Sequence, residues 1–164
     1  MRRKDKEITD YSEIEAIIQR AQVCHLALFD KDFPYVIPLN FGYQDGCLYF
    51  HSAKEGKKIE LLRKNNRVSF EFDIDLAIEM TDKACNWTTK YRSVIGYGRA
   101  KIIDETAAKR EALNILVKHY SGKTFNYFPE AIADTLIIQV TIESMSGKKS
   151  GFEETTEDEL KSWQ

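Results

Sequence analysis

The sequence predicts a mainly β domain, in which an antiparallel β-barrel is flanked by helices. About six short segments have the β-rich or alternating pattern of half-buried strands, and short polar turns separate several of them. The pattern is clearest between residues 67 and 74, where every second residue is large and apolar: Val68, Phe70, Phe72 and Ile74. Three helical segments interrupt the strands without the regular alternation typical of a parallel sheet, so the antiparallel barrel is favoured.

The elements can be placed in order along the chain. Strands are expected at residues 23–29, 33–43, 47–51, 67–74, 93–103 and 135–142. The first two are expected to form a hairpin around the polar residues Asp30–Asp32. Helices are expected at about residues 12–21, 52–65 and 105–121. Ser12 with Glu15, and Ser52 with Glu55, have the spacing of capping boxes that open the first two helices. Gly122 is suited to end the third.

Length and composition indicate one folded domain. A chain of 164 residues buries roughly 70 % of the surface that its unfolded form exposes, which suits a single core. We expect this domain to span residues 1–150. Residues 151–164 are acidic and poor in large aliphatic side chains, and we expect them to form a mobile tail.

Charge, hydropathy and cysteine content argue against several classes of protein. The net charge of −2 provides no broad basic surface for nucleic acid, and no segment approaches the roughly 20 apolar residues of a membrane span. The three cysteines lie far apart and form no C-x-x-C motif, so a reducing, cytoplasmic location is expected. His25 and His119 have no partners at metal-ligand spacing, so no metal site is predicted. The signatures of nucleophile-elbow hydrolases, P-loops and Rossmann folds do not occur.

The segment from His51 to Lys58 is a candidate phosphate site, because a strand turns into a helix there. Cations near a helix N-terminus oppose the helix dipole at a cost of about 0.3–1 kcal/mol each, so three lysines at this point need compensation. Free N–H groups, the Ser52 hydroxyl and the ammonium groups of Lys57 and Lys58 could converge on a phosphate. The alternative is a solvated lysine face that binds no ligand, and the spacing alone does not separate the two.

The segment from Pro34 to Gly42 contains two prolines within a predicted strand. Proline removes a hydrogen-bond donor from the sheet and so indicates an edge or a bulge. The free backbone groups of an edge, together with the Asn40 amide, could bind the polar rim of a planar heterocycle. A blunted edge that prevents aggregation explains the same pattern and is favoured by these residues alone.

Further candidates lie in and before the strand at 93–103, and at the end of the strand at 47–51. Gly96 and Gly98 share one strand face, which indicates close approach by a backbone, a ring or a ligand, or packing between subunits. Trp87 and Arg92 could cover a bound ligand, although aromatic loop residues more often fill core or interface volume. His51 could donate a proton near a redox centre, although a lone histidine at a strand end is more often structural.

Taken together, several blocks resemble the pyridoxamine 5′-phosphate oxidase-like superfamily, and more closely its branch related to 5-nitroimidazole resistance proteins. The resemblance covers about residues 1–150, and the order of the blocks is more specific than any one of them. The blocks that carry it are Tyr35–Tyr43, Leu48–Ala53, Gly56–Lys58, Tyr91–Gly98 and Ser146–Lys149.

This resemblance implies a split barrel that forms a homodimer and holds flavin mononucleotide (FMN) in clefts between its subunits. It also implies roles for individual residues. The isoalloxazine ring would contact the segment containing Val36, Pro38, Leu39 and Asn40. The phosphate would contact Ser52, Lys57 and Lys58, and His51 would lie near the ring as the candidate catalytic residue. Trp87, Arg92 and Ser93 would come from the partner subunit.

The implied function is that of an FMN-dependent oxidoreductase that reduces a small acceptor such as a nitroaromatic compound. The Arg and His pattern expected near the C-terminus of a true pyridoxamine phosphate oxidase does not occur, so that substrate is not expected. A non-catalytic flavin-binding or flavin-sensing protein is the alternative, because fold and cofactor do not define chemistry. A related split barrel that binds haem or a deazaflavin is a third interpretation.

Overall fold

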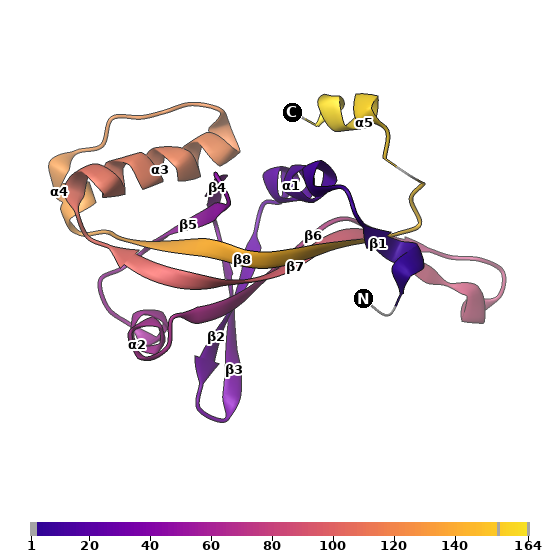
Figure 1. The fold of residues 1–164 in the computed structure, drawn as a ribbon, viewed down its shortest axis with the longest axis horizontal. Helices are drawn as coiled ribbons and strands as arrows, with labels where there is room; N and C mark the ends of the chain where they lie inside the picture. Colours follow the sequence, from indigo (N-terminus) through magenta and orange to yellow (C-terminus); the bar gives the residue numbers. More distant parts are fainter. Residues whose placement is uncertain (1–2, 154, 164) are drawn as a thin grey trace. The chain divides into compact units, whose positions relative to one another are not determined.

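The computed structural model of the chain describes residues 3–153 and 155–163. Within these residues, eight strands form one sheet in the order β3-β2-β6-β7-β8-β5-β4, with β1 beside β8 (Figure 1). The pairs β1–β8, β2–β3, β4–β5 and β5–β8 are antiparallel, and helices flank the strands. The predicted class, a mainly β antiparallel fold with flanking helices, is therefore confirmed. No helix among the described residues combines the length and apolar character needed to span a lipid bilayer.

The element bounds extend several of the predicted segments. The strands are β1 (Glu7–Ile8), β2 (Cys24–Asp30), β3 (Phe33–Leu39), β4 (Gly42–Gln44), β5 (Cys47–Ser52), β6 (Arg67–Glu79), β7 (Thr88–Ile103) and β8 (Leu136–Ser150). The helices are α1 (Tyr11–Arg20), α2 (Lys57–Lys64), α3 (Thr106–Ser121), α4 (Pro129–Ala133) and α5 (Glu157–Ser162), with 3-10 turns at Lys4–Lys6 and Ala84–Asn86. The sequence did not predict β1, α4 or α5.

The chain divides into two compact units, and strands β6, β7 and β8 contribute to both. Unit 1 comprises Met1–Ala21, Glu71–Ile95 and Met145–Gln164, and unit 2 comprises Gln22–Phe70 and Gly96–Ser144.

Unit 2 contains the β2–β3 hairpin, β4, β5 and three helices. Helix α2 packs on β2, and α3 packs on β4 and β5 (Figure 1). The Tyr120 hydroxyl ties α3 to two strand ends, because it accepts a hydrogen bond from the Phe41 N–H at 2.9 Å and donates one to the Gln22 carbonyl at 2.8 Å. Large side chains that are almost fully buried form the core: Leu26, Phe41, Leu48, Phe50, Ile59, Phe70, Ile132, Ile137 and Ile138.

Unit 1 is built around α1, β1 and the ends of the long strands. β1 pairs with β8, so that Ile8 lies opposite Gly147. A β carbon on Gly147 would lie 2.8 Å from Ile14 Cγ1 and 2.9 Å from Ile8 Cβ, which shows how closely α1 and β1 cover this strand. The tail was predicted to be mobile, whereas the structure contains a helix within it. Its residues 157–162 form α5, and Glu159 pairs with Arg92. Residues 154 and 164 of the tail lie outside the described residues.

The helix ends correct two predicted capping boxes and confirm one predicted stop. Helix α1 is capped by Asp10, whose carboxylate accepts from the Ser12 N–H at 2.8 Å, so Ser12 lies inside the helix. Ser52 ends β5, and the N-cap of α2 is Gly56, with no side chain capping the helix. Gly122 ends α3 in the left-handed region, as predicted.

The two glycines of β7 permit close internal packing. A β carbon on Gly96 would lie 2.1 Å from Phe70 Cζ, and one on Gly98 would lie 2.4 Å from the Thr141 carbonyl oxygen. Of the explanations that the sequence left open, an aromatic ring therefore applies at Gly96 and a neighbouring backbone at Gly98.

We predict that Gly96→Ala destabilises the protein by about 1–3 kcal/mol, because Phe70 is almost fully buried and cannot yield easily. Phe70→Leu alone should also destabilise the protein, because it leaves a cavity. The double variant should be more stable than the sum of the two effects predicts, since the smaller side chain makes room for the methyl group. Denaturant titration of the four proteins measures this coupling, and simple additivity would contradict the packing argument.

Candidate functional site

The start of helix α2 is an uncapped N-terminus at the end of a strand. Gly56 has φ of 115°, which residues with side chains rarely adopt, and it provides no side-chain cap. Its carbonyl accepts from the N–H groups of Ile59 and Glu60 at 3.0 and 3.1 Å. The N–H groups that precede them belong to the first turn, which has no partners within a helix. The local backbone therefore presents donors, as an anion site requires.

Lys57, the first residue of α2, is held by the β2–β3 hairpin. Its ammonium lies 2.6 Å from a carboxylate oxygen of Asp30 and 4.7 Å from the centre of the Tyr35 ring. The hydrogen bond with Asp30 raises the pKa of Lys57 above its ordinary value. The charge of Lys57 is thus already balanced, and the side chain connects α2 to the hairpin.

Lys58, the next residue, is in a different electrostatic position. The side chain is half-buried, and this burial lowers the pKa of Lys58 below the ordinary lysine value. Among residues 3–153 and 155–163, no carboxylate pairs with its ammonium group. A desolvated cation without a counter-ion is unfavourable, and a bound anion would offset that cost.

Ser52 and His51 lie on opposite faces of β5. The burial of the strand alternates, so Ser52 lies on the buried face with Leu48 and Phe50, whereas His51 is exposed on the other face. In the sheet register, Ser52 is opposite Leu136 and His51 is opposite Ile137. The two residues therefore cannot contact the same part of a small ligand from the same side of the strand.

Strand β3 lies at the edge of the sheet, as its two prolines predicted. It pairs with β2, with Pro38 opposite His25 and Leu39 opposite Cys24, and it ends the strand order. Val36, Pro38 and Asn40 are exposed, and Leu39 is half-buried. Because the Lys57 ammonium lies over Tyr35 in the same strand, the hairpin and the start of α2 are brought together.

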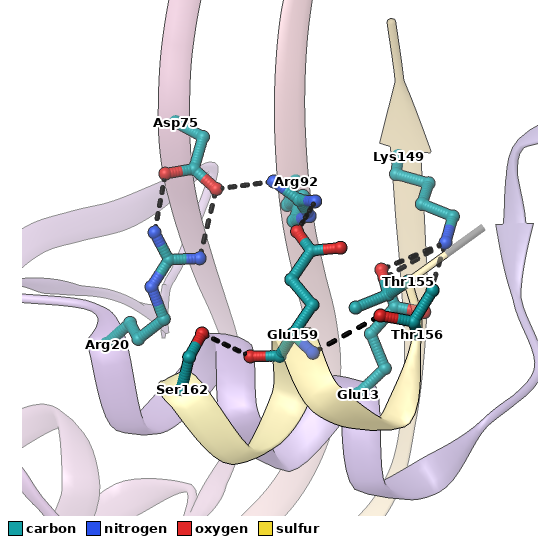
Figure 2. Close-up of polar contacts among 9 residues, drawn as sticks. All are labelled: Glu13, Arg20, Asp75, Arg92, Lys149, Thr155, Thr156, Glu159 and Ser162. Atoms are coloured by element: carbon teal, nitrogen blue, oxygen red, sulfur yellow. Dashed lines mark hydrogen bonds and ion pairs between the residues drawn. The ribbon is translucent and has the colours of Figure 1, made fainter. Parts of the chain in front are cut away.

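The remaining candidates, Trp87, Arg92 and Ser93, belong to unit 1. Trp87 is half exposed, and its indole N–H donates to the Thr81 carbonyl at 2.9 Å. Ser93 is half-buried. The Arg92 side chain is only 5 % exposed, and its guanidinium pairs with Asp75 at 2.7 Å and Glu159 at 3.1 Å (Figure 2). Arg92 is therefore engaged within its own unit.

Sequence reasoning missed Asp30 and the separate environments of the two lysines. In the sequence Asp30 belongs only to the polar segment 30–32, and its position directly after the predicted strand at 23–29 was the available signal. A groove of about 420 Å³ also lies in unit 2, and its lining includes Tyr49, Lys101, Glu111 and Gln139. Partial burial raises the pKa of Tyr49, whose hydroxyl accepts from the Gln139 amide at 3.2 Å. None of the predicted site residues lines this groove.

Solved structures of known proteins share this fold. A candidate 5-nitroimidazole antibiotic resistance protein from Bacteroides thetaiotaomicron VPI-5482 superposes with a TM-score of 0.79 and 34 % sequence identity, covering 87 % of this chain and 86 % of that chain. A FAD-binding protein from Mesorhizobium loti has a TM-score of 0.62 and 27 % identity, covering 87 % and 96 %. The flavocytochrome Anf3 from Azotobacter vinelandii, with a TM-score of 0.80 and 20 % identity over 99 % and 77 %, shows the fold alone.

These similarities define a split-barrel protein, and the sequence match defines its family. Residues 10–149 match the family described as pyridoxamine 5′-phosphate oxidase. The chain belongs to this family, and the resemblance stated from its motifs is confirmed. No curated protein matches the sequence closely enough to count as a relative.

We predict that the two adjacent lysines titrate apart. Lys58 should reach its midpoint at a lower pH than an exposed lysine, because burial disfavours its charged form. Lys57 should reach its midpoint at a higher pH, because Asp30 stabilises its charge. NMR titration of the lysine side chains measures both. As a control, Asp30→Asn should lower the Lys57 midpoint and leave that of Lys58 in place; equal midpoints in the parent protein would contradict the assignment.

Proposed function

We propose that the chain is an FMN-binding oxidoreductase whose phosphate site lies at the start of α2. The observation that supports this most directly is the half-buried ammonium of Lys58, which has no carboxylate partner in the described part of the chain. Lys58 is the second residue of α2, and no side chain caps the first N–H groups of this helix. A lysine without a carboxylate partner and uncapped helix N–H groups together suit a phosphate dianion. The similar Mesorhizobium loti protein is named for binding FAD, which agrees with a flavin but does not choose between FMN and FAD.

The proposal gives each unit 2 candidate a role. Lys58 and the first N–H groups of α2 hold the phosphate, and Lys57 orients the helix start against the hairpin through Asp30. The Ser52 hydroxyl contributes from the end of β5. The exposed edge of β3, with Val36, Pro38, Leu39 and Asn40, offers backbone and amide groups to the rim of the ring. Bound FMN would supply hydride and electron transfer, and the protein would supply its orientation.

We also propose a homodimer, with Trp87 and Ser93 reaching the flavin of the partner subunit. Three large apolar side chains at alternate positions in unit 1 support a subunit contact: Leu76, Ile78 and Met80 are 62 %, 61 % and 67 % exposed. A contribution from Arg92, also proposed from the sequence, requires its guanidinium to leave Asp75 or Glu159. A cytoplasmic location and the lack of a metal site stay predictions from the sequence.

The acceptor is proposed to be a small molecule such as a nitroaromatic compound. The similar Bacteroides protein is named as a candidate 5-nitroimidazole antibiotic resistance protein, and this name is the observation that favours the class. A non-catalytic flavin-binding or flavin-sensing protein is the second candidate, because the one proposed proton donor, His51, is exposed and has no resolved partner among the described side chains. Bound haem or deazaflavin would be distinguished from FMN by its absorption spectrum.

We predict that Lys58→Met weakens FMN binding by about tenfold or more, because the phosphate loses a charge-assisted contact. Riboflavin, which has the same ring without the phosphate, should bind the parent and the variant alike. Lys64→Met, which removes a lysine from the last turn of the same helix, is the matched control. Flavin fluorescence titration of the three proteins with FMN and with riboflavin gives six dissociation constants. Light scattering of the same samples should show a dimer.

Two results would contradict the phosphate site. The first is an equal loss of FMN and riboflavin affinity in Lys58→Met, which would indicate structural damage. The second is a parent protein that retains no flavin after unbound FMN is removed, which would exclude the cofactor itself.

We predict that His51→Ala slows reoxidation of the reduced, FMN-loaded protein by a nitroaromatic acceptor by roughly 10²-fold, if His51 donates a proton or positions the acceptor. FMN occupancy should stay at the parental level, because His51 lies on the opposite strand face from Ser52. Stopped-flow mixing with NADH or NADPH measures the reduction of the bound FMN. A second mixing step with the nitroaromatic acceptor measures its reoxidation. Reoxidation at the parental rate would end the catalytic assignment, and a parent that is never reduced would favour the binding or sensing function.

A further inference from the structure

The C-terminal segment, defined as residues 152–153 and 155–163, belongs to unit 1 and contacts the rest of that unit at two polar clusters (Figure 2). In the first cluster, Glu159 accepts from Nη2 of Arg92 at 3.1 Å. The aromatic ring of Phe152 lies 3.8 Å from the guanidinium carbon of Arg92, and that of Trp163 lies 4.9 Å from it. Arg92 is thus enclosed by one carboxylate and two rings of the segment.

The base of this cluster is a carboxylate shared by two arginines. Asp75 accepts from Arg20 at 2.7 and 3.0 Å and from Arg92 at 2.7 Å. Although partial burial alone would raise the pKa of Asp75, the hydrogen bonds and charges of Arg20 and Arg92 lower it. The guanidinium groups of Arg20 and Arg92 carry two positive charges, and Asp75 neutralises only one of them. Glu159 supplies the second negative charge.

The contact between Arg92 and Glu159 is incomplete. A guanidinium binds a carboxylate best through two parallel N–H groups, and the edge formed by Nε and Nη2 offers such a pair. Glu159 uses Nη2, whereas the buried Nε has no hydrogen-bond partner in the described part of the chain. A buried donor without a partner is costly, so a carboxylate that accepts from both nitrogen atoms would bind this edge better than Glu159 does.

The second cluster anchors the beginning of the segment independently. The Lys149 ammonium donates to both carboxylate oxygens of Glu13 at 3.1 Å, and the Thr155 hydroxyl donates to Glu13 at 2.5 Å. This cluster lies before α5 in the chain. Helix α5 has six residues and is too short to be stable alone, so it depends on the contacts of Glu159 and Trp163. Release of these contacts would free α5 while Thr155 stays attached.

We propose that Arg92 and Arg20 form a binding site for an aromatic carboxylate, and that Glu159 and Trp163 of the same chain occupy it as an internal ligand. An incoming ligand replaces Glu159 with a carboxylate that meets both Nε and Nη2 of Arg92. Its ring replaces that of Trp163, which lies 4.3 Å from the Arg20 guanidinium carbon. The site belongs to unit 1 and does not depend on the proposed flavin function.

Trypsin provides a test in the full-length chain, because Lys161 lies within α5 and is cleaved only when α5 is released. Intact-protein mass spectrometry follows the early loss of residues 162–164. The rate of this loss reports the fraction of molecules in which α5 is released. Glu159→Gln should speed this cleavage about fivefold, since a half-exposed charge pair contributes modestly. Glu153→Gln is the matched control, because it makes the same substitution in the C-terminal segment at an exposed carboxylate outside α5. Equal cleavage of the two variants would overturn the internal-ligand assignment.

Competition tests the ligand class. Indole-3-propionate, at concentrations on the order of 10 mM, should speed cleavage of the parent at Lys161 by displacing Glu159 and Trp163. Propionate, which has no ring, and 3-indolepropanol, which has no charge, should have little effect. Arg92→Lys keeps the charge but removes the pair of N–H groups at Nε and Nη2, so indole-3-propionate should no longer speed cleavage of this variant. Circular dichroism establishes that this variant is folded, and a chromogenic peptide shows that trypsin itself is unaffected. No acceleration by indole-3-propionate, or equal acceleration by the neutral alcohol, would overturn the site.

Discussion

Two glycines of β7 determine how closely the central strands of unit 2 approach one another. The Phe70 ring occupies the space beside Gly96, and the Thr141 backbone occupies the space beside Gly98. A side chain at either position would displace β7 from β6 or from β8. In the sheet, β2 follows β6 and β5 follows β8, and these two strands lead into the edge hairpin and helix α2. The candidate site therefore depends on packing to which its own side chains do not contribute.

The start of α2 shows how two identical neighbours acquire different roles. Successive residues of a helix point about 100° apart, so Lys57 reaches the hairpin and Lys58 lies half-buried in another direction. Lys57 meets Asp30 and Tyr35, whereas burial acts on Lys58 without a compensating carboxylate in the described residues. A phosphate would balance the charge of Lys58. It would be attracted less by Lys57, because the charge of Lys57 is already balanced by Asp30. The sequence placed both lysines in one role because spacing alone does not show which side chain already has a partner.

Features that follow from the backbone preferences of single residues were predicted well, whereas the helix starts and the features that depend on distant partners were not. The end of α3 at Gly122 and the edge position of β3 follow from the backbone preferences of glycine and proline, which act wherever the chain folds. The first capping box was wrong because Asp10 and Ser12 are both good caps, and local sequence does not choose between them. The second was wrong because Ser52 is paired in β5, and the N-cap of α2 is Gly56. Helix α5 was missed because its six residues are stabilised by Arg92, which lies far away in the sequence.

Arg92 extends this reasoning to the question of what it can bind. If its guanidinium turned toward a neutral ring, Glu159 would lose its charged partner and Asp75 would keep only Arg20. Separating these charges costs free energy, because Arg92 is buried and its two carboxylate partners are partly buried. A ligand that takes over Arg92 must therefore bring negative charge to the position of Glu159. A phosphate would meet this requirement as well as a carboxylate, and at the site proposed for Arg92 the C-terminal segment would compete with either ligand.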